Sequence, residues 1–184
     1  MHRTISPIEA VQHRDAGAFH RWSALPTAPV ENPGAVDATF SVRNVLVVCL
    51  GNVCRSPMAE FILRRRLGGR DVIVGSAGIA ATNGARIDPL ALLVLDRHGI
   101  DADAHVARRL ERSMIDAADL VLVMERTQLD FIRAGLPSAT GKTFLLGKWQ
   151  GGFEIPDPFG KSRETFDHLY RTVDTATRRW CELI

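Results

Sequence analysis

Hydrophobic positions along most of this chain follow two alternating patterns. Short, continuous apolar runs rich in valine, leucine and isoleucine are typical of strands buried on both faces of a parallel sheet. Such runs predict strands at residues 45–48, 71–76, 119–124 and 142–146. Between them, apolar residues recur every three or four positions and predict helices at residues 57–67, 88–98, 126–134 and from 163 onward. The alternation predicts an α/β fold, a doubly wound four-stranded parallel sheet with helices on both faces.

Residues at the helix boundaries support these predictions. Ser56-Pro57 and Asp88-Pro89 each place a good N-cap before a proline at the first helical position. Gly99 is placed to end the second helix. The last helix carries one apolar stripe, made of Phe166, Leu169, Tyr170, Val173, Ala176, Trp180 and Leu183. We expect this stripe to face the core.

The first 41 residues lack both patterns. Prolines and glycines interrupt them, at Pro7, Gly17, Pro26, Pro29, Pro33 and Gly34. We expect residues 1–41 to form a poorly ordered N-terminal extension with a short helix near residues 8–13. It is either a dispensable tail or a segment that binds a partner or covers a site. Residues 42–184 then form the single folded domain.

Composition and charge narrow the function. Of 184 residues, 23 are Lys or Arg and 21 are Asp or Glu, a formal net charge of +2 that argues against a nucleic-acid partner. No apolar run exceeds about six residues, so we expect no membrane insertion. Charged residues near the N-terminus, among them Glu9 and Arg14, argue against a secretory signal peptide. Only three cysteines are present, which favours a cytoplasmic protein without disulfides.

The segment Cys49–Ser56 carries the clearest chemical signal. It follows the first predicted strand and leads into a helix, where backbone N–H groups and the helix dipole attract an anion. Gly51 lets the backbone turn closely round a ligand. Arg55 supplies a planar fork of donors for two oxygens of a tetrahedral oxyanion. The same field favours the thiolate of Cys49, which would attack phosphorus from the floor of this phosphate loop. The alternative is a buried packing cysteine and a surface arginine.

A thiolate nucleophile needs a general acid to protonate the leaving oxygen. The best candidate is Asp157, because Pro156 and Pro158 stiffen the backbone on both sides of it and hold it on a loop. Aspartate in such a segment is also a common turn former. Glu125, just beyond the third strand, is the rival acid.

Four segments resemble the low molecular weight protein-tyrosine phosphatases. They are residues 48–57, 76–78, 119–125 and 157–159, and the resemblance covers about residues 43–184. Residues 154–166 resemble a bacterial branch that acts beside autophosphorylating tyrosine kinases in capsule and exopolysaccharide export. The resemblance implies a protein-tyrosine phosphatase whose partner is a phosphotyrosine protein, such as a cognate bacterial tyrosine kinase.

The resemblance also implies roles for single residues. Cys49 is the nucleophile that forms a phosphocysteine, Arg55 binds phosphate, and Asp157 is the acid and then the base. Asn52 holds the loop in shape with Ser76 as its support, and Ser56 donates a hydrogen bond to the thiolate. The remaining substrate contacts come from Leu50, Gly51, Asn52, Val53, Cys54, Ser56 and Phe159. No metal and no cofactor is implied, because Arg55 and the loop amides supply the electrostatic stabilisation.

Other residues are open or depart from the family pattern. Cys54 matches a cysteine that forms a reversible disulfide with the nucleophile, although packing is an alternative. Phe159 stands where the family usually has tyrosine, and Tyr170 is the only tyrosine in the chain. Trp149 matches an aromatic residue near the acid loop or simply packs in the core. Cys181 has no assigned role.

Two other functions compete with this interpretation. An arsenate reductase of the same fold needs two further cysteines close together, and none lies between Arg55 and Trp180. A phosphotyrosine-binding module without turnover would need neither Cys49 nor Asp157. A nucleotide-binding loop is excluded because the segment lacks the Gly-Lys-Ser/Thr ending.

Overall fold

The computed structural model describes residues 42–184, which build a four-stranded, wholly parallel sheet. The strands are β1 (Asn44–Cys49), β2 (Ile73–Gly78), β3 (Leu120–Val123) and β4 (Thr143–Leu145), in the spatial order β2-β1-β3-β4. β1 pairs with both β2 and β3, so it is central, and its carboxyl end lies at the point where the strand order reverses. Open α/β sheets bind ligands at this switch point. The predictions for residues 1–41 lie outside the described residues.

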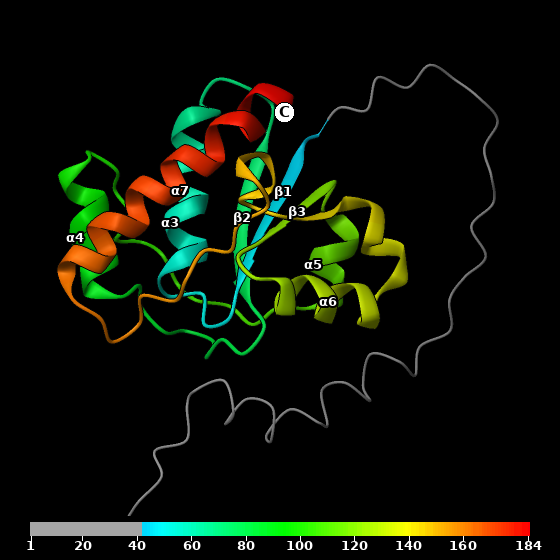
Figure 1. Cartoon of the computed structure of the whole chain (residues 1–184), viewed down its shortest axis with the longest axis horizontal. Coiled ribbons are helices and arrows are strands. Elements are labelled where there is room, and N and C mark those ends of the chain that lie inside the picture. Colours follow the sequence, from blue (N-terminus) through cyan, green and yellow to red (C-terminus); the bar gives the residue numbers. More distant parts are fainter. Residues whose placement is uncertain (1–41) are drawn as a thin grey trace, which may run out of the picture. The chain divides into compact units, whose positions relative to one another are not determined.

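Helices cover both faces of the sheet, as predicted (Figure 1). One face carries α3 (Arg55–Arg66), α4 (Pro89–Arg97) and α7 (Arg163–Leu183), with α7 packed on both α3 and α4. The other face carries α5 (Arg112–Ala117), against β1, and α6 (Arg126–Gly135), against β3 and β4. Two short 3₁₀ helices, Pro137–Lys142 and Lys148–Gln150, flank β4. No helix among residues 42–184 has the length and apolar character to span a membrane.

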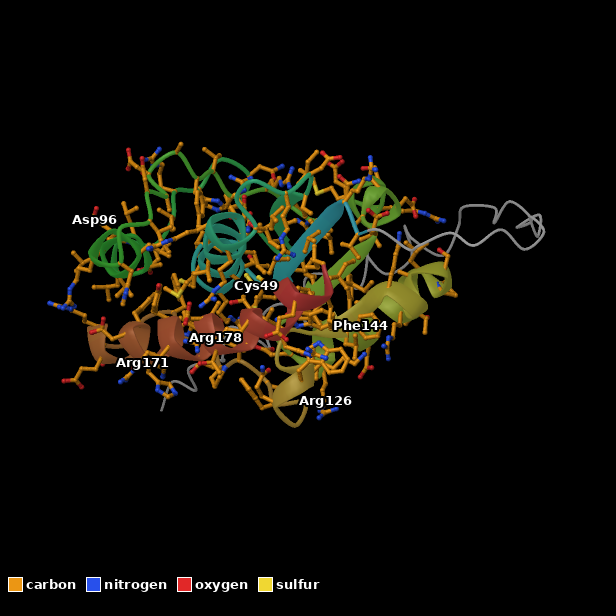
Figure 2. All side chains as sticks on the ribbon, turned by 90° about the horizontal axis from the view of Figure 1, so that it is seen from above. Cys49, Asp96, Arg126, Phe144, Arg171 and Arg178 are labelled. Atoms are coloured by element: carbon orange, nitrogen blue, oxygen red, sulfur yellow. The ribbon has the colours of Figure 1, made fainter. Side chains whose placement is uncertain are left out.

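The apolar runs form the core for the expected reason. Val47, Val48 and Leu122 are fully buried, because helices cover both sides of the strands on which they lie. The stripe on α7 is also buried, apart from Leu183, which is 48% exposed at the end of the helix. Leu183 therefore does not join the buried part of the stripe, although Trp180 and Cys181 in the same turn do face the core. Figure 2 shows charged side chains such as Asp96, Arg126 and Arg171 at the outer edge of this fold.

Two helix boundaries carry notable contacts. Asp88 caps α4 as predicted, since its side chain accepts a hydrogen bond from the backbone N–H of Leu90 at 2.8 Å. Gly99 has a φ of +67° just after this helix, which a residue with a side chain would adopt at a cost.

On α7, the buried ring of Tyr170 stacks on His98 with 3.7 Å between the ring centroids.

Two predicted strands need correction, and one helix was not predicted. β2 lies two residues later than predicted, because its pairing with β1 continues until Gly78 stands opposite Cys49. α5 was not predicted, because it has only six residues and no full apolar stripe. β3 begins at Leu120 rather than at Asp119, whose carboxylate instead accepts backbone N–H groups from the start of β1.

Candidate active site

The phosphate loop connects the end of β1 to the start of α3. Cys49 is the last residue of β1 and is 2% exposed. Its Sγ lies 2.9 Å from Ser56 Oγ and accepts the backbone N–H of Asn52 at 3.2 Å. Two hydrogen-bonding groups therefore meet at the sulfur, and both are able to donate to it.

The loop owes its shape to Asn52. This residue has a φ of +55°, the only positive φ of a non-glycine residue among residues 42–184. Its side-chain amide donates to Ser56 Oγ at 2.9 Å and to Ser76 Oγ at 2.8 Å, while its Oδ1 accepts the backbone N–H of Arg108 at 2.9 Å. The turn predicted for Gly51 is thus made at Asn52, because asparagine tolerates the left-handed region when its side chain is bonded locally.

A further set of buried polar groups supports Asn52 and was missed by sequence reasoning. Ser76 Oγ donates to the carboxylate of Glu60, which also forms an ion pair with Arg64. The ring Nε2 of His105 lies 2.9 Å from the backbone oxygen of Asn52. No local motif marks His105 or Arg108, since both lie on a loop more than fifty residues from the loop that they contact. The helical spacing from Ser56 to Glu60 was the only available signal for Glu60.

The first turn of α3 differs from the prediction. The helix begins at Arg55 and not at Pro57, and Ser56 makes no cap hydrogen bond. The Ser56 hydroxyl is instead engaged by Cys49 and Asn52, so it serves the loop. Pro57 is tolerated at the third helical position because the first four N–H groups of a helix have no intrahelical partner. The helix start therefore merges with the phosphate loop.

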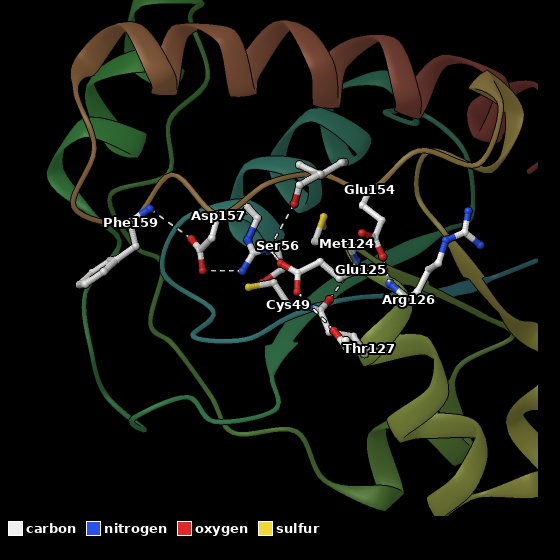
Figure 3. A network of polar contacts seen from close by, with 12 residues as sticks. Cys49, Ser56, Met124, Glu125, Arg126, Thr127, Glu154, Asp157 and Phe159 are labelled. Atoms are coloured by element: carbon white, nitrogen blue, oxygen red, sulfur yellow. Dashed lines mark hydrogen bonds and ion pairs between the residues drawn. The ribbon is translucent and has the colours of Figure 1, made fainter. Parts of the chain in front are cut away.

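Arg55 brings the loop into contact with two other segments. Its side chain is 2% exposed. Nη1 donates to Glu125 Oε1 and, at 3.1 Å, to the backbone oxygen of Ile155, while Nη2 donates to Asp157 Oδ2 at 2.6 Å. Figure 3 shows this network with Cys49, Glu125 and Asp157 labelled. Burial opposes the charge of the guanidinium, but the neighbouring Cys49, Asp157 and Glu125 outweigh it and raise the pKa of Arg55. Arg55 therefore stays protonated.

The acid loop reaches the site from beyond β4. The backbone N–H of Ile155 donates to the Met124 oxygen at 2.9 Å, which fixes this loop to the end of β3. Asp157 is 41% exposed, and its Oδ1 accepts the backbone N–H of Phe159 at 3.1 Å. The ring of Phe159 is 63% exposed beside this turn, as Figure 3 shows. The carboxyl group of Asp157 and the exposed ring of Phe159 therefore lie next to each other on the acid loop, where both are accessible to solvent.

The remaining predicted residues divide into backbone and buried positions. The oxygens of Leu50 and Val53 accept the backbone N–H groups of Ala80 and Asp88, at 2.9 Å each. Cys54 is 3% exposed, and burial, reinforced by Asp88 and Asp157, raises the pKa of its thiol. All three cysteines are free thiols.

Trp149 lies outside the phosphate loop and the acid loop. It is 44% exposed and packs edge-on against the buried Trp180, with ring centroids 5.6 Å apart. It therefore belongs to an aromatic group on the rim of the core. Within residues 42–184, no group of three or more His, Cys, Asp or Glu side chains is arranged to hold a metal ion.

A parallel sheet with a cysteine, a phosphate loop and an arginine at its switch point defines a class of phosphoryl-transfer enzymes. The family model described as low molecular weight phosphotyrosine protein phosphatase matches residues 44–184. The chain therefore belongs to this family of hydrolases with a cysteine nucleophile. Family membership does not favour the arsenate reductase or the binding module as alternatives.

Individual relatives agree with this assignment. The probable low molecular weight protein-tyrosine-phosphatase AmsI of Erwinia amylovora is 40% identical over 139 residues, which are 76% of this chain and 95% of that protein. The structure of Vibrio vulnificus Wzb in complex with benzylphosphonate is 36% identical, with a TM-score of 0.74 over 78% of this chain and all of the other. The YwlE arginine phosphatase from Geobacillus stearothermophilus is also 36% identical, with a TM-score of 0.72 over 77% of this chain and 92% of the other.

Proposed function

We propose that this protein hydrolyses phosphotyrosine through a phosphocysteine at Cys49. The thiolate attacks phosphorus and forms the S–P bond while the bond to the tyrosyl oxygen breaks. Asp157 gives its proton to the leaving oxygen. Asp157 then takes a proton from a water molecule, which attacks phosphorus, breaks the S–P bond and releases phosphate and the Cys49 thiolate.

Arg55 and the loop amides stabilise the charge on the transferring group in this scheme. The amides of residues 50–56 surround an anion at the start of α3, and Arg55 binds its oxygens from the side. Donors that are already in place need no reorganisation during the reaction. The single observation that carries the proposal is the contact between Arg55 and Asp157 at 2.6 Å, because it joins the phosphate loop to the acid loop.

The proposed substrate is a phosphotyrosine protein, specifically an autophosphorylating tyrosine kinase of bacterial capsule or exopolysaccharide export. The resemblance of residues 154–166 to that bacterial branch supports this choice. The exposed ring of Phe159 next to Asp157 offers an apolar surface to the tyrosyl ring. We also propose a cytoplasmic location, since a reactive thiol with two further free cysteines suits a reducing compartment.

The test is turnover of matched phosphopeptides with phosphotyrosine, phosphoserine or phosphoarginine at the same position. We expect hydrolysis of phosphotyrosine without added metal, inhibition by vanadate, and a trapped phosphoenzyme. Cys49→Ser should abolish turnover and the trapped species while phosphate binding stays. Normal turnover by Cys49→Ser would disprove the mechanism. A preference for phosphoarginine, the residue type for which the Geobacillus arginine phosphatase is named, would overturn the substrate class alone.

We further propose that residues 42–184 carry the whole of this activity. The family model begins at residue 44, and every residue of the proposed mechanism lies beyond it. Removal of residues 1–41 should therefore leave kcat on p-nitrophenyl phosphate within about twofold, with the full chain as control. A loss of activity would instead show that the extension contributes to the site.

A further inference from the structure

Two carboxylates bind one guanidinium in this site, and they bind different nitrogens. The two N–H groups of Arg55 Nη1 meet two acceptors, Glu125 Oε1 and the oxygen of Ile155. Asp157 takes only one N–H of Nη2. The edge formed by Nε and Nη2 is the one that can bind two oxygens of a phosphoryl group side by side.

The two carboxylates also differ in how they are held. Glu125 lies one residue beyond the buried strand β3 and immediately before α6, and its side chain is 25% exposed. Asp157 lies on a loop between two prolines and is 41% exposed. The less exposed Glu125 carboxylate is better shielded from water, whereas the more exposed Asp157 carboxylate can exchange its contact with Arg55 for water or for a ligand.

We propose that Glu125 is the positioning residue for Arg55, and that Asp157 occupies on Nη2 the place of a phosphoryl oxygen. This rests on the proposed phosphatase function. Glu125 holds Nη1 away from the anion and thereby turns the edge of Nε and Nη2 toward the loop. The substrate phosphoryl group displaces Asp157 from Nη2, and the freed Asp157 carboxyl then serves the leaving oxygen.

Charge supports this division of roles. Asp157 cannot hold the guanidinium as an anion and donate a proton to the leaving group at the same moment, since the donor form is neutral. A dianionic phosphoryl group competes well for Arg55 because its bond is bidentate and charge-assisted. Glu125 neither donates the proton nor competes with the phosphoryl group for Nη2. It can therefore stay bound to Nη1 throughout the reaction. From the sequence alone, Glu125 is an alternative general acid. In the structure, its contact with Nη1 supports the positioning of Arg55 instead.

The experiment compares Glu125→Ala, Glu125→Gln and Asp157→Ala in the full chain. Substrates are p-nitrophenyl phosphate and phenyl phosphate, which has the poorer leaving group. Binding of inorganic phosphate is measured by calorimetry. The control is Asp130→Asn, a charge loss on the exposed face of the same helix α6. Thermal unfolding of each variant shows whether it is folded.

We expect Glu125→Ala to lower kcat/KM about 10²-fold on both substrates alike and to weaken phosphate binding, because Arg55 is misplaced. Glu125→Gln keeps an acceptor for Nη1, so it should recover part of the loss in kcat/KM and part of the loss in phosphate binding. Asp157→Ala should bind phosphate at least as tightly as the wild type. It should lose roughly 10²–10⁴-fold in kcat, and most on phenyl phosphate.

Three results would overturn the proposal. The first is a Glu125→Ala loss concentrated on phenyl phosphate with unchanged phosphate binding, which would make Glu125 the acid. The second is a Glu125→Ala protein that behaves like Asp130→Asn. The third is weaker phosphate binding by Asp157→Ala. Failure of the wild type to hydrolyse either substrate would instead reject the proposed function, since phosphate binding is measured separately.

Discussion

The side-chain amide of Asn52 donates to Ser76 Oγ over 2.8 Å and thereby joins the phosphate loop to the middle of β2. A non-glycine residue in the left-handed region costs of order 1–3 kcal/mol and persists only where its surroundings hold it. Asn52 is held by Ser56, Ser76 and Arg108. The strain at this residue is therefore balanced by hydrogen bonds within its own loop, to β2 and to the segment that carries Arg108.

Ser76→Ala should weaken both stability and catalysis. The substitution removes the acceptor for Asn52 and the donor to Glu60, which is 5% exposed. A buried polar group left without its partner costs about 1–3 kcal/mol. Urea unfolding should report a loss of this size, and kcat should fall because the loop is less well held. Ser113→Ala, at an exposed hydroxyl, is the matched control; equal behaviour of the two variants would contradict the support role.

Gly78→Ala should disrupt the phosphate loop, because Gly78, at the end of β2, lies against the backbone of that loop. A Cβ at Gly78 would lie 2.7 Å from the Leu50 oxygen and 2.8 Å from the Asn52 nitrogen, so backbone must move. A displacement near 1 Å can cost about 10²-fold in rate, and kcat/KM on p-nitrophenyl phosphate measures it. Gly141→Ala is the control, because nothing lies within 4 Å of its added Cβ. An active, stable Gly78→Ala protein would show that the loop tolerates the shift.

Cys54 should protect the nucleophile from irreversible oxidation. Peroxide converts the Cys49 thiolate to a sulfenic acid, and attack by the Cys54 sulfur then forms a disulfide and releases water. The raised pKa of Cys54 keeps it a neutral thiol, so this second step should be slow. After peroxide treatment long enough to oxidise Cys49 of the Cys54→Ala protein beyond the sulfenic acid, dithiothreitol should restore wild-type activity and restore much less in Cys54→Ala. Cys181→Ala is the control and should recover like the wild type. Equal recovery of the wild type and Cys54→Ala would show that Cys54 is only a packing residue.

Asp119 should make stability depend on acid pH. Its Oδ2 accepts the backbone N–H groups of Arg43 and Asn44 at 2.9 and 2.8 Å, which lowers its pKa in the folded protein. The unfolded pKa is about 3.9, so the stabilisation is complete above that pH and is lost as the pH falls through the lower folded pKa. Asp119→Asn should therefore cost about 1 kcal/mol at neutral pH, and the difference should shrink below about pH 4. Asp130→Asn, at an exposed position on α6 and measured by the same urea titration, is the control for the loss of one carboxylate charge.

The sequence predicted those parts of the fold that depend on short-range patterns. The continuous apolar runs and the Asp88-Pro89 start are decided by neighbours in the chain, and β1, β3 and α4 follow them closely, whereas β2 is shifted by its pairing with β1. The start of α3 was misplaced for a physical reason. Ser56 has the composition of a cap, but the nearby Cys49 and Asn52 side chains compete for its hydroxyl and win.

The candidate site shows the same division. Cys49 and Arg55 share one loop, so their spacing indicates their proximity. Asp157 is 102 residues from Arg55, and only its proline context and the family resemblance pointed to it. His105 and Arg108 carry no signal of their own, because their contact with Asn52 exists only after the loop after α4 folds back onto the phosphate loop.

Tyr170 limits where a tyrosine kinase, including the one proposed as the substrate, could phosphorylate this protein. It is the only tyrosine of the chain, its side chain is buried, and its ring is stacked on His98. Any phosphorylation of this protein on tyrosine would therefore have to take place at this one residue of α7. A tyrosine kinase that acted on this protein could mark it at a single position only, on a helix that carries none of the residues of the proposed mechanism.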